Sequence, residues 1–127
     1  MKPKEIKAAY IAVHELAKVP LPYRAAREIY QLKKSLAAEI DVLAELEKAM
    51  VEKYGGQISR GGEYTFPGNR GAAFLAEYEQ AMEDDVVIHL PEVDLSAHAD
   101  ALRLSPGALE ALDGLVIFER GVDKYGG

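Results

Sequence analysis

The apolar positions at the start of the chain recur at helical spacing. Over residues 3–18, Ile6, Tyr10 and Val13 lie three or four residues apart, which is typical of an amphipathic helix. The segment 19–22 then contains two prolines, and proline disfavours helix at the residue before it. The pattern therefore predicts a short first helix followed by a break.

A second and much longer helix is predicted over residues 22–54, with a length of about 50 Å at 1.5 Å per residue. The segment has no interior glycine and is rich in Ala, Leu, Glu and Lys, which favour helix. Gly55 follows as a typical C-terminal stop. One apolar stripe runs along the helix, and it consists of Ile29, Leu32, Leu36, Leu43, Leu46 and Met50.

The predicted length of this helix raises the question of what covers its stripe. A globule of 127 residues has a radius of gyration of about 14 Å, so the helix cannot be buried along its whole length. In a helical hairpin over residues 1–56, the first helix would cover about half of the stripe and leave roughly two turns open. We therefore expect a homo-oligomer in which the open turns meet another subunit.

The remainder of the chain, residues 57–127, is predicted to add a β-hairpin, a helix and a small sheet. Two short strands, 57–60 and 63–66, flank a turn with two glycines. The other predicted elements are a helix over 70–84, strands over 86–90 and 115–118, short helices that begin at Ser96 and Ser105, and a frayed end over 120–127. The sequence thus predicts a single α+β domain: a long helix with a short packed helix, a small antiparallel sheet and short C-terminal helices.

Charge narrows the choice of partners. The chain has 15 basic and 21 acidic residues and a net charge of −6, whereas nucleic-acid binding needs a basic surface. No apolar run approaches the roughly 20 residues of a membrane helix, so we expect neither nucleic acid nor membrane as a partner. Residues 1–34 carry a net +5 and residues 77–127 a net −9. The two ends either pair within one chain or steer head-to-tail contact between copies.

Residues with catalytic or ligand-binding chemistry are sparse. The chain has no cysteine, which excludes disulfides and thiol nucleophiles. Gly56 and Gly61 have the spacing of a phosphate loop, but Gly62 and Glu63 follow in place of the lysine and the serine or threonine, and the acid would repel phosphate. The best metal candidates are His89, Glu92, Asp94, His98 and Asp100, but they contain no H-E-x-x-H motif, and Pro91 and Asp94 are typical of an ordinary loop. We therefore expect no cofactor, no metal and no enzymatic activity.

Contact with other proteins is the function that these patterns favour. The apolar stripe of the long helix is the predicted surface, and Tyr64 and Phe66 at the hairpin tip are predicted aromatic anchors. The alternative is a host-directed inhibitor or a small-ligand binder, with a pocket beside the sheet that Tyr64, Phe66 and His89 would line.

Three stretches of the chain resemble a family of small uncharacterised proteins encoded by tailed bacteriophages and prophages of Gram-positive bacteria. They are the run 13–22 (VHELAKVPLP), the end of the long helix at 51–55 (VEKYG), and the run 86–95 followed by 104–106 and 109–112. The resemblance implies a phage-encoded accessory protein in the cytoplasm of a bacterial host. Head or tail assembly and contact with a host factor are the tasks it suggests, and it carries over no catalytic residues.

Overall fold

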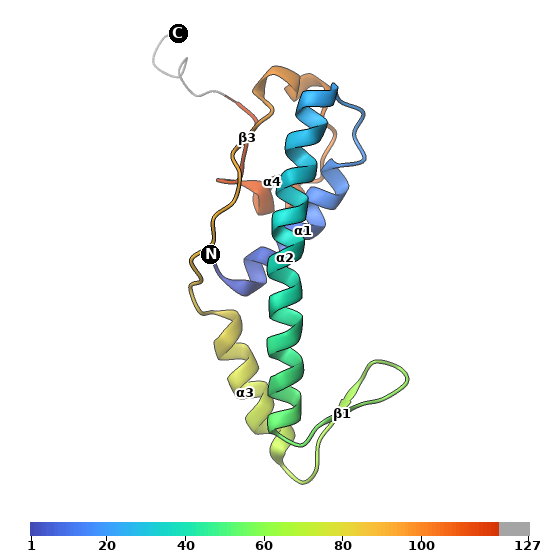
Figure 1. Cartoon of the computed structure of the whole chain (residues 1–127), viewed down its shortest axis with the longest axis vertical. Coiled ribbons are helices and arrows are strands. Elements are labelled where there is room, and N and C mark those ends of the chain that lie inside the picture. The colour runs from blue at the N-terminus through green and yellow to red at the C-terminus, as the bar shows by residue number, and fades with distance from the viewer. Residues whose placement is uncertain (120–127) are drawn as a thin grey trace.

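A computed structural model describes residues 1–119 of the chain, and the predicted fraying over 120–127 lies outside the described residues. The chain is an α+β protein dominated by one long helix (Figure 1). Its helices are α1 (Pro3–Leu16), α2 (Tyr23–Lys53), α3 (Arg70–Met82), the 3₁₀ helix η1 (Ser96–Ala101) and α4 (Pro106–Leu112). Its strands are β1 (Gln57–Ile58), β2 (Tyr64–Thr65), β3 (Val93–Asp94) and β4 (Val116–Ile117).

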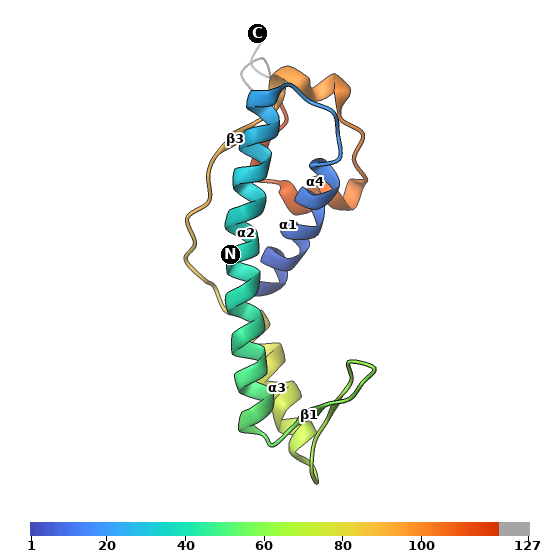
Figure 2. The same cartoon turned by 45° about the vertical axis from the view of Figure 1, so that its right-hand side comes forward.

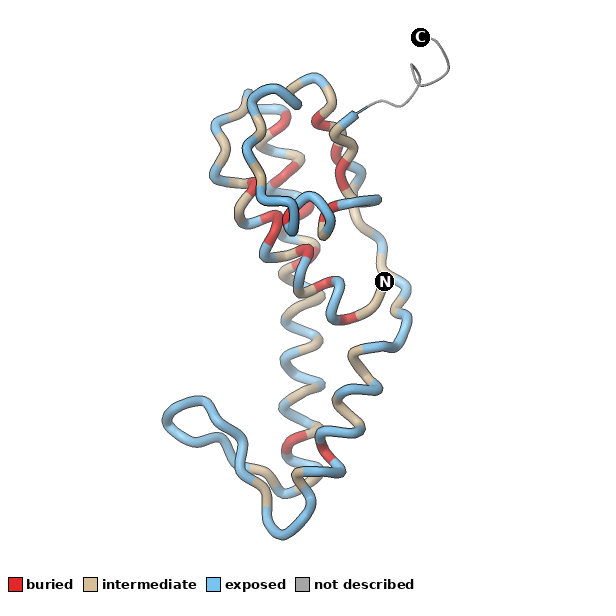
Figure 3. The backbone as a smooth tube through the Cα atoms, turned by 180° about the vertical axis from the view of Figure 1, so that it is seen from behind, coloured by how far each residue is buried: buried red, intermediate tan, exposed pale blue. Residues whose placement is uncertain are grey.

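The hydrophobic core lies at one end of the molecule, where α1, the first half of α2, β3, α4 and β4 meet. We call this end the head. Buried positions are concentrated there (Figure 3), and they comprise Ile6, Ala9, Ala12, Val13, Leu16, Ala25, Ile29, Leu32, Leu36, Val93, Leu95, Ala108, Leu112 and Val116. The predicted helices over 3–18 and 22–54 are confirmed, with α1 covering the first half of α2.

The second half of α2 leaves the head and forms the axis of an arm, which we define as residues 39–82. α3 packs beside this half of α2, and the β1–β2 hairpin projects from the far end (Figures 1 and 2). Only Val51 and Phe74 are buried in the arm. The helix is thus too long for the head, as its length predicts, and α3 of the same chain covers part of what remains.

The two pairs of strands differ in direction. β1 and β2 are antiparallel, with Gln57 opposite Thr65, which confirms the predicted hairpin. β3 and β4 are parallel, and the register places Val93 opposite Val116. A parallel pair needs a crossover, which η1 and α4 supply between the two strands. These C-terminal strands therefore close the head by a crossover instead of extending an antiparallel sheet.

Among residues 1–119 the strand predicted over 86–90 does not form, and the ladder that follows this segment begins at Val93. Val86 instead exchanges backbone hydrogen bonds with Met1, at 2.9 and 3.0 Å. The β-branched composition of 86–90 suits an extended backbone, but no strand of the described part of the chain lies alongside it to complete a ladder. Val93 and Leu95 are fully buried, so the pairing forms where the side chains enter the core.

Charge pairing between the two ends of the sequence occurs within this chain. The amino group of Met1 lies 3.0 Å from Asp85, and the side chains of Lys2 and Lys4 both contact Glu83. Hydrogen bonds from Lys2 and then Lys4 lower the pKa of Glu83 to about 2. These contacts therefore agree with the first interpretation of the charge asymmetry, in which the two ends pair within one chain. None of the helices within residues 1–119 is long and apolar enough to cross a membrane.

Candidate interaction surfaces

The predicted contact stripe is divided between the head and the arm. Ile29, Leu32 and Leu36 are at most 1% exposed, because α1 and β3 pack over this half of α2. A partner could reach these three side chains only by unfolding the head. The structure therefore places these three side chains in the core of the head.

The other half of the stripe, Leu43, Leu46 and Met50, is only partly buried. Leu43 and Met50 are half-buried, whereas Leu46 is 58% exposed. α3 packs along this half of α2, and Lys53 of α2 forms a 2.8 Å ion pair with Glu77 of α3. That hydrogen bond lowers the pKa of Glu77 and raises the pKa of Lys53. Leu46 lies away from this cover and is the member of the predicted stripe most available to a partner.

The predicted aromatic anchors belong to a cluster that fixes the hairpin to the arm. The ring of Phe66 lies 4.8 Å from that of Phe74 on α3, and the ring of Tyr64 lies 5.8 Å from it. Tyr78 stacks on Phe74 at 5.8 Å, and the hydroxyl of Tyr64 donates a 2.7 Å hydrogen bond to Glu47. That bond raises the pKa of Tyr64.

This cluster corrects the position expected for the anchors. Phe66 follows β2 at the base of the hairpin, whereas Tyr64 pairs with Ile58 at the end of the ladder that borders the turn. The turn itself is closed by a hydrogen bond from Gly62 to Ser59. The sequence carries a signal for the cluster, because Phe74 and Tyr78 share one face of α3 at a spacing of four residues. Their rings take up the contacts that a partner was expected to make.

Exposed apolar side chains on the arm lie outside the predicted stripe. Val42 is 53% exposed, Leu75 is 53% exposed and Ile58 is 57% exposed. The apolar periodicity of the sequence identifies the buried faces of α2 and α3, and Val42 and Leu75 lie outside those faces. Together with Ile58 and Leu46 they place four apolar side chains that are more than half exposed on the arm. Ile11, Tyr23 and Val87 are more exposed still, but they lie outside the arm.

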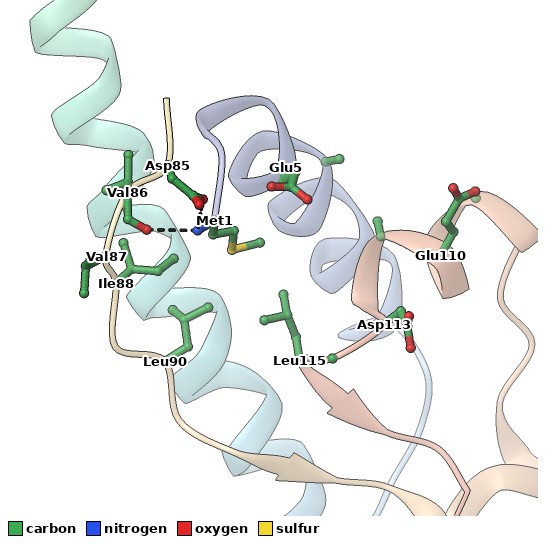
Figure 4. Close-up of a pocket in the computed structure, with 14 residues that line it drawn as sticks. Met1, Glu5, Asp85, Val86, Val87, Ile88, Leu90, Glu110, Asp113 and Leu115 are labelled. Carbon is green, nitrogen blue, oxygen red and sulfur yellow. Dashed lines mark hydrogen bonds and ion pairs between the residues drawn. The ribbon is translucent and has the colours of Figure 1, made fainter. Parts of the chain in front are cut away.

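A groove with a volume of about 870 Å³ lies between the N-terminus, the extended segment 85–90 and α4 (Figure 4). Its apolar wall includes Val86, Ile88, Leu90 and Leu115, and its rim carries carboxylates. The acidic residues that line it are Glu5, Asp85, Glu110 and Asp113. The amino group of Met1 contacts Asp85 and the Val86 carbonyl at one end (Figure 4). The groove suits an apolar ligand that carries positive charge.

The pocket predicted for a small ligand does not form from the residues expected. Tyr64 and Phe66 lie at the far end of the arm, whereas His89 is exposed on the segment that leads to β3 beside the head (Figure 1). The metal candidates likewise remain dispersed, since residues 1–119 contain no group of three or more side chains that could hold a metal ion. Asp94 accepts hydrogen bonds from the backbone and hydroxyl of Ser96, at 3.0 and 2.7 Å.

The fold and its surfaces define an elongated α+β protein with a helical arm. Comparison with protein-family models gives no match, and neither the curated proteins nor the solved structures include a significant match to this chain.

Proposed function

We propose that this protein is a non-catalytic accessory protein that acts through protein–protein contacts made by its arm. The observation that carries the proposal is the exposure of Val42 and Leu46 on α2 and of Leu75 on α3, all more than half exposed. Ordering a helix beyond the core costs conformational entropy, and the apolar area that such a segment buries is too small to offset that cost. Binding of a partner protein would bury the exposed apolar side chains of the arm and offset this cost.

We further propose that the protein is encoded by a phage or prophage and works in the cytoplasm of a bacterial host, with virion assembly as one task. The resemblance of the runs 13–22, 51–55 and 86–95 to small phage proteins supports this part. Its test is mass spectrometry of phage particles and of lysates from induced host cells. Peptides of the chain in purified particles would support a structural role, and peptides in the lysate alone would favour a role in the infected cell.

The contact function is tested by the absolute mass in solution, measured by light scattering on a sizing column at low and high salt. We expect an oligomer, and we expect Val42→Asp with Leu46→Asp to reduce its mass while the circular dichroism spectrum stays that of the folded protein. Ile11→Asp is the matched control, since Ile11 is 69% exposed on α1 and lies outside the arm. An equal effect of the control, or no effect of the arm variant, would refute the arm as the contact surface.

The groove supports a second candidate function, the binding of a cationic amphiphilic ligand. Its apolar wall and acidic rim occur together, and its volume falls within the usual range for ligand sites. Octylammonium is a suitable probe, and octanoate has a similar chain and the opposite charge. A saturable rise in melting temperature with octylammonium alone, lost in Ala8→Trp, would support this function. Equal responses to both probes would refute it.

A further inference from the structure

Four exposed charges on the outer face of α2 fall into two blocks, and the exposed Asp41 and Lys48 lie beside them on the same helix. Arg27 and Lys34 lie in the first half of the helix, whereas Glu45 and Glu52 lie in the second half. All four side chains are exposed, and none forms an ion pair with another residue among 1–119. Each block has a spacing of seven residues, so all four lie close to one line along the helix.

An uncharged strip runs beside this line and has the same symmetry. It consists of Gln31, Ala38, Val42 and Ala49, all exposed. The intervals along the strip are seven, four and seven residues, which read the same in both directions. Those intervals keep the four residues on one side of a helix. The charged line is also symmetric in its intervals, but its charge changes sign from one half to the other.

We propose that α2 pairs in antiparallel orientation with α2 of a second copy of this chain, through the uncharged strip and the charged line. Arg27 then faces Glu52 of the second copy. Lys34 faces Glu45 of the second copy, and twofold symmetry repeats both pairs. Ala38 faces Val42 of the second copy near the centre, where the small side chain lets the helices approach. The proposal rests on the proposed contact function, names its partner, and extends the contact from the arm to the first half of α2.

The distribution of charge favours this occupant over solvent and over a parallel arrangement. A helix face in water gains from opposite charges three or four residues apart. Here Lys48 is the one cation within a turn of both Glu45 and Glu52, and Arg27 and Lys34 have no anion at those spacings. A parallel dimer would place each charge against its own copy. The antiparallel pair alone matches every charge of the line with its opposite.

The shape of the molecule leaves room for such a pair. Figure 2 shows α1, α4 and the hairpin on one side of α2 and the extended segment that leads to β3 on the other, with α2 itself in front between them. Leu46, at the edge of the uncharged strip, would be partly covered by the second helix. This pairing therefore accounts for the exposure of Val42 and Leu46 on α2 and for the length of the helix.

Charge reversal provides the test. Arg27→Glu with Lys34→Glu makes the line wholly acidic, and Glu45→Lys with Glu52→Lys makes it wholly basic. We expect each double variant alone to weaken dimerisation at least about tenfold, because the contacts become repulsive. An equimolar mixture should restore a heterodimer, and the variant with all four reversals should dimerise by itself. Sedimentation velocity at low salt measures each state.

The control is a pair of reversals away from α2, Lys18→Glu with Arg60→Glu, which should leave the dimer unchanged. Single cysteines report orientation cleanly, because the chain has none of its own. In the proposed register two Ala38→Cys positions are offset by about 6 Å along the axis, and two Gln31→Cys positions by about 27 Å. A short bismaleimide should therefore cross-link the former and not the latter.

Three results would overturn the pairing. Efficient cross-linking through Gln31→Cys would mean a parallel arrangement. An oligomer that persists in both reversed variants would mean assembly through another surface, and the contact function would stand without this partner. A wild-type chain that stays monomeric at all concentrations would remove the second copy, and the contact function would then require a different protein.

Discussion

Truncation of Leu36 gives the sharpest test of the division between head and arm. Leu36 is completely buried against α1, so Leu36→Ala removes three buried carbon atoms and leaves a cavity. Such substitutions reduce the free energy of unfolding by about 2–5 kcal/mol. A domain of this size has roughly 5–15 kcal/mol in total, so the loss is a large share. Urea denaturation followed by circular dichroism at 222 nm measures it.

Leu46→Ala is the matched control on the same helix. Leu46 is 58% exposed, so about two fifths of its surface is covered and the expected loss is below about 1 kcal/mol. Both variants are measured at two protein concentrations, because self-association would add a concentration-dependent term. A larger loss for Leu46 than for Leu36 would refute the placement of the core in the first half of α2.

Two further predictions concern the contacts that hold the arm. The pKa of Glu83 is lowered from 4.5 to about 2, chiefly by Lys2, so its stabilising contribution is present above pH 4.5 and is lost as the pH falls toward 2. Denaturation midpoints across this range should fall less steeply in Glu83→Gln. Gly56→Ala should destabilise the hairpin by about 1–3 kcal/mol, because the new Cβ would lie 2.5 Å from Phe66. Faster hydrogen exchange over 57–66 reports this loss.

Each of these predictions has its own contrary result. An unchanged pH dependence in Glu83→Gln would show that the contact with Lys2 adds nothing to the folded state. For the hairpin, Gly61→Ala is the control, since its Cβ would meet only Ser59 at 3.9 Å. Equal exchange rates in Gly56→Ala and Gly61→Ala would contradict the close packing of Gly56 on the aromatic cluster.

The helices could be predicted because their signals are local. Proline at the first turn of α1, the unbroken run of helix formers in α2 and the serine cap of α4 each act within a few residues. The side chain of Ser105 indeed accepts a 3.2 Å hydrogen bond from the backbone of Ala108. The excess length of α2 also followed from counting residues against the size of the domain.

The remaining features depend on contacts between distant segments. The parallel pairing of β3 with β4 requires knowing how η1 and α4 cross the head, which no local pattern encodes. The same holds for the aromatic cluster, where Phe66 and Phe74 come from different elements. The stripe of α2 was predicted as one surface because periodicity gives the face of a helix but not which neighbour covers each turn. For this reason Leu36 and Leu46 were assigned alike.

The continuity of α2 through head and arm has a mechanical consequence. Lys53 at its end lies 17 residues beyond Leu36, a distance of about 25 Å along the axis. A tilt of about 10° at the head would therefore displace the far end by about 4 Å, whereas the head side chains themselves would move much less. Helix α2 is thus a lever, and small rearrangements of packing around Ile29 and Leu32 are converted into a larger displacement of the hairpin.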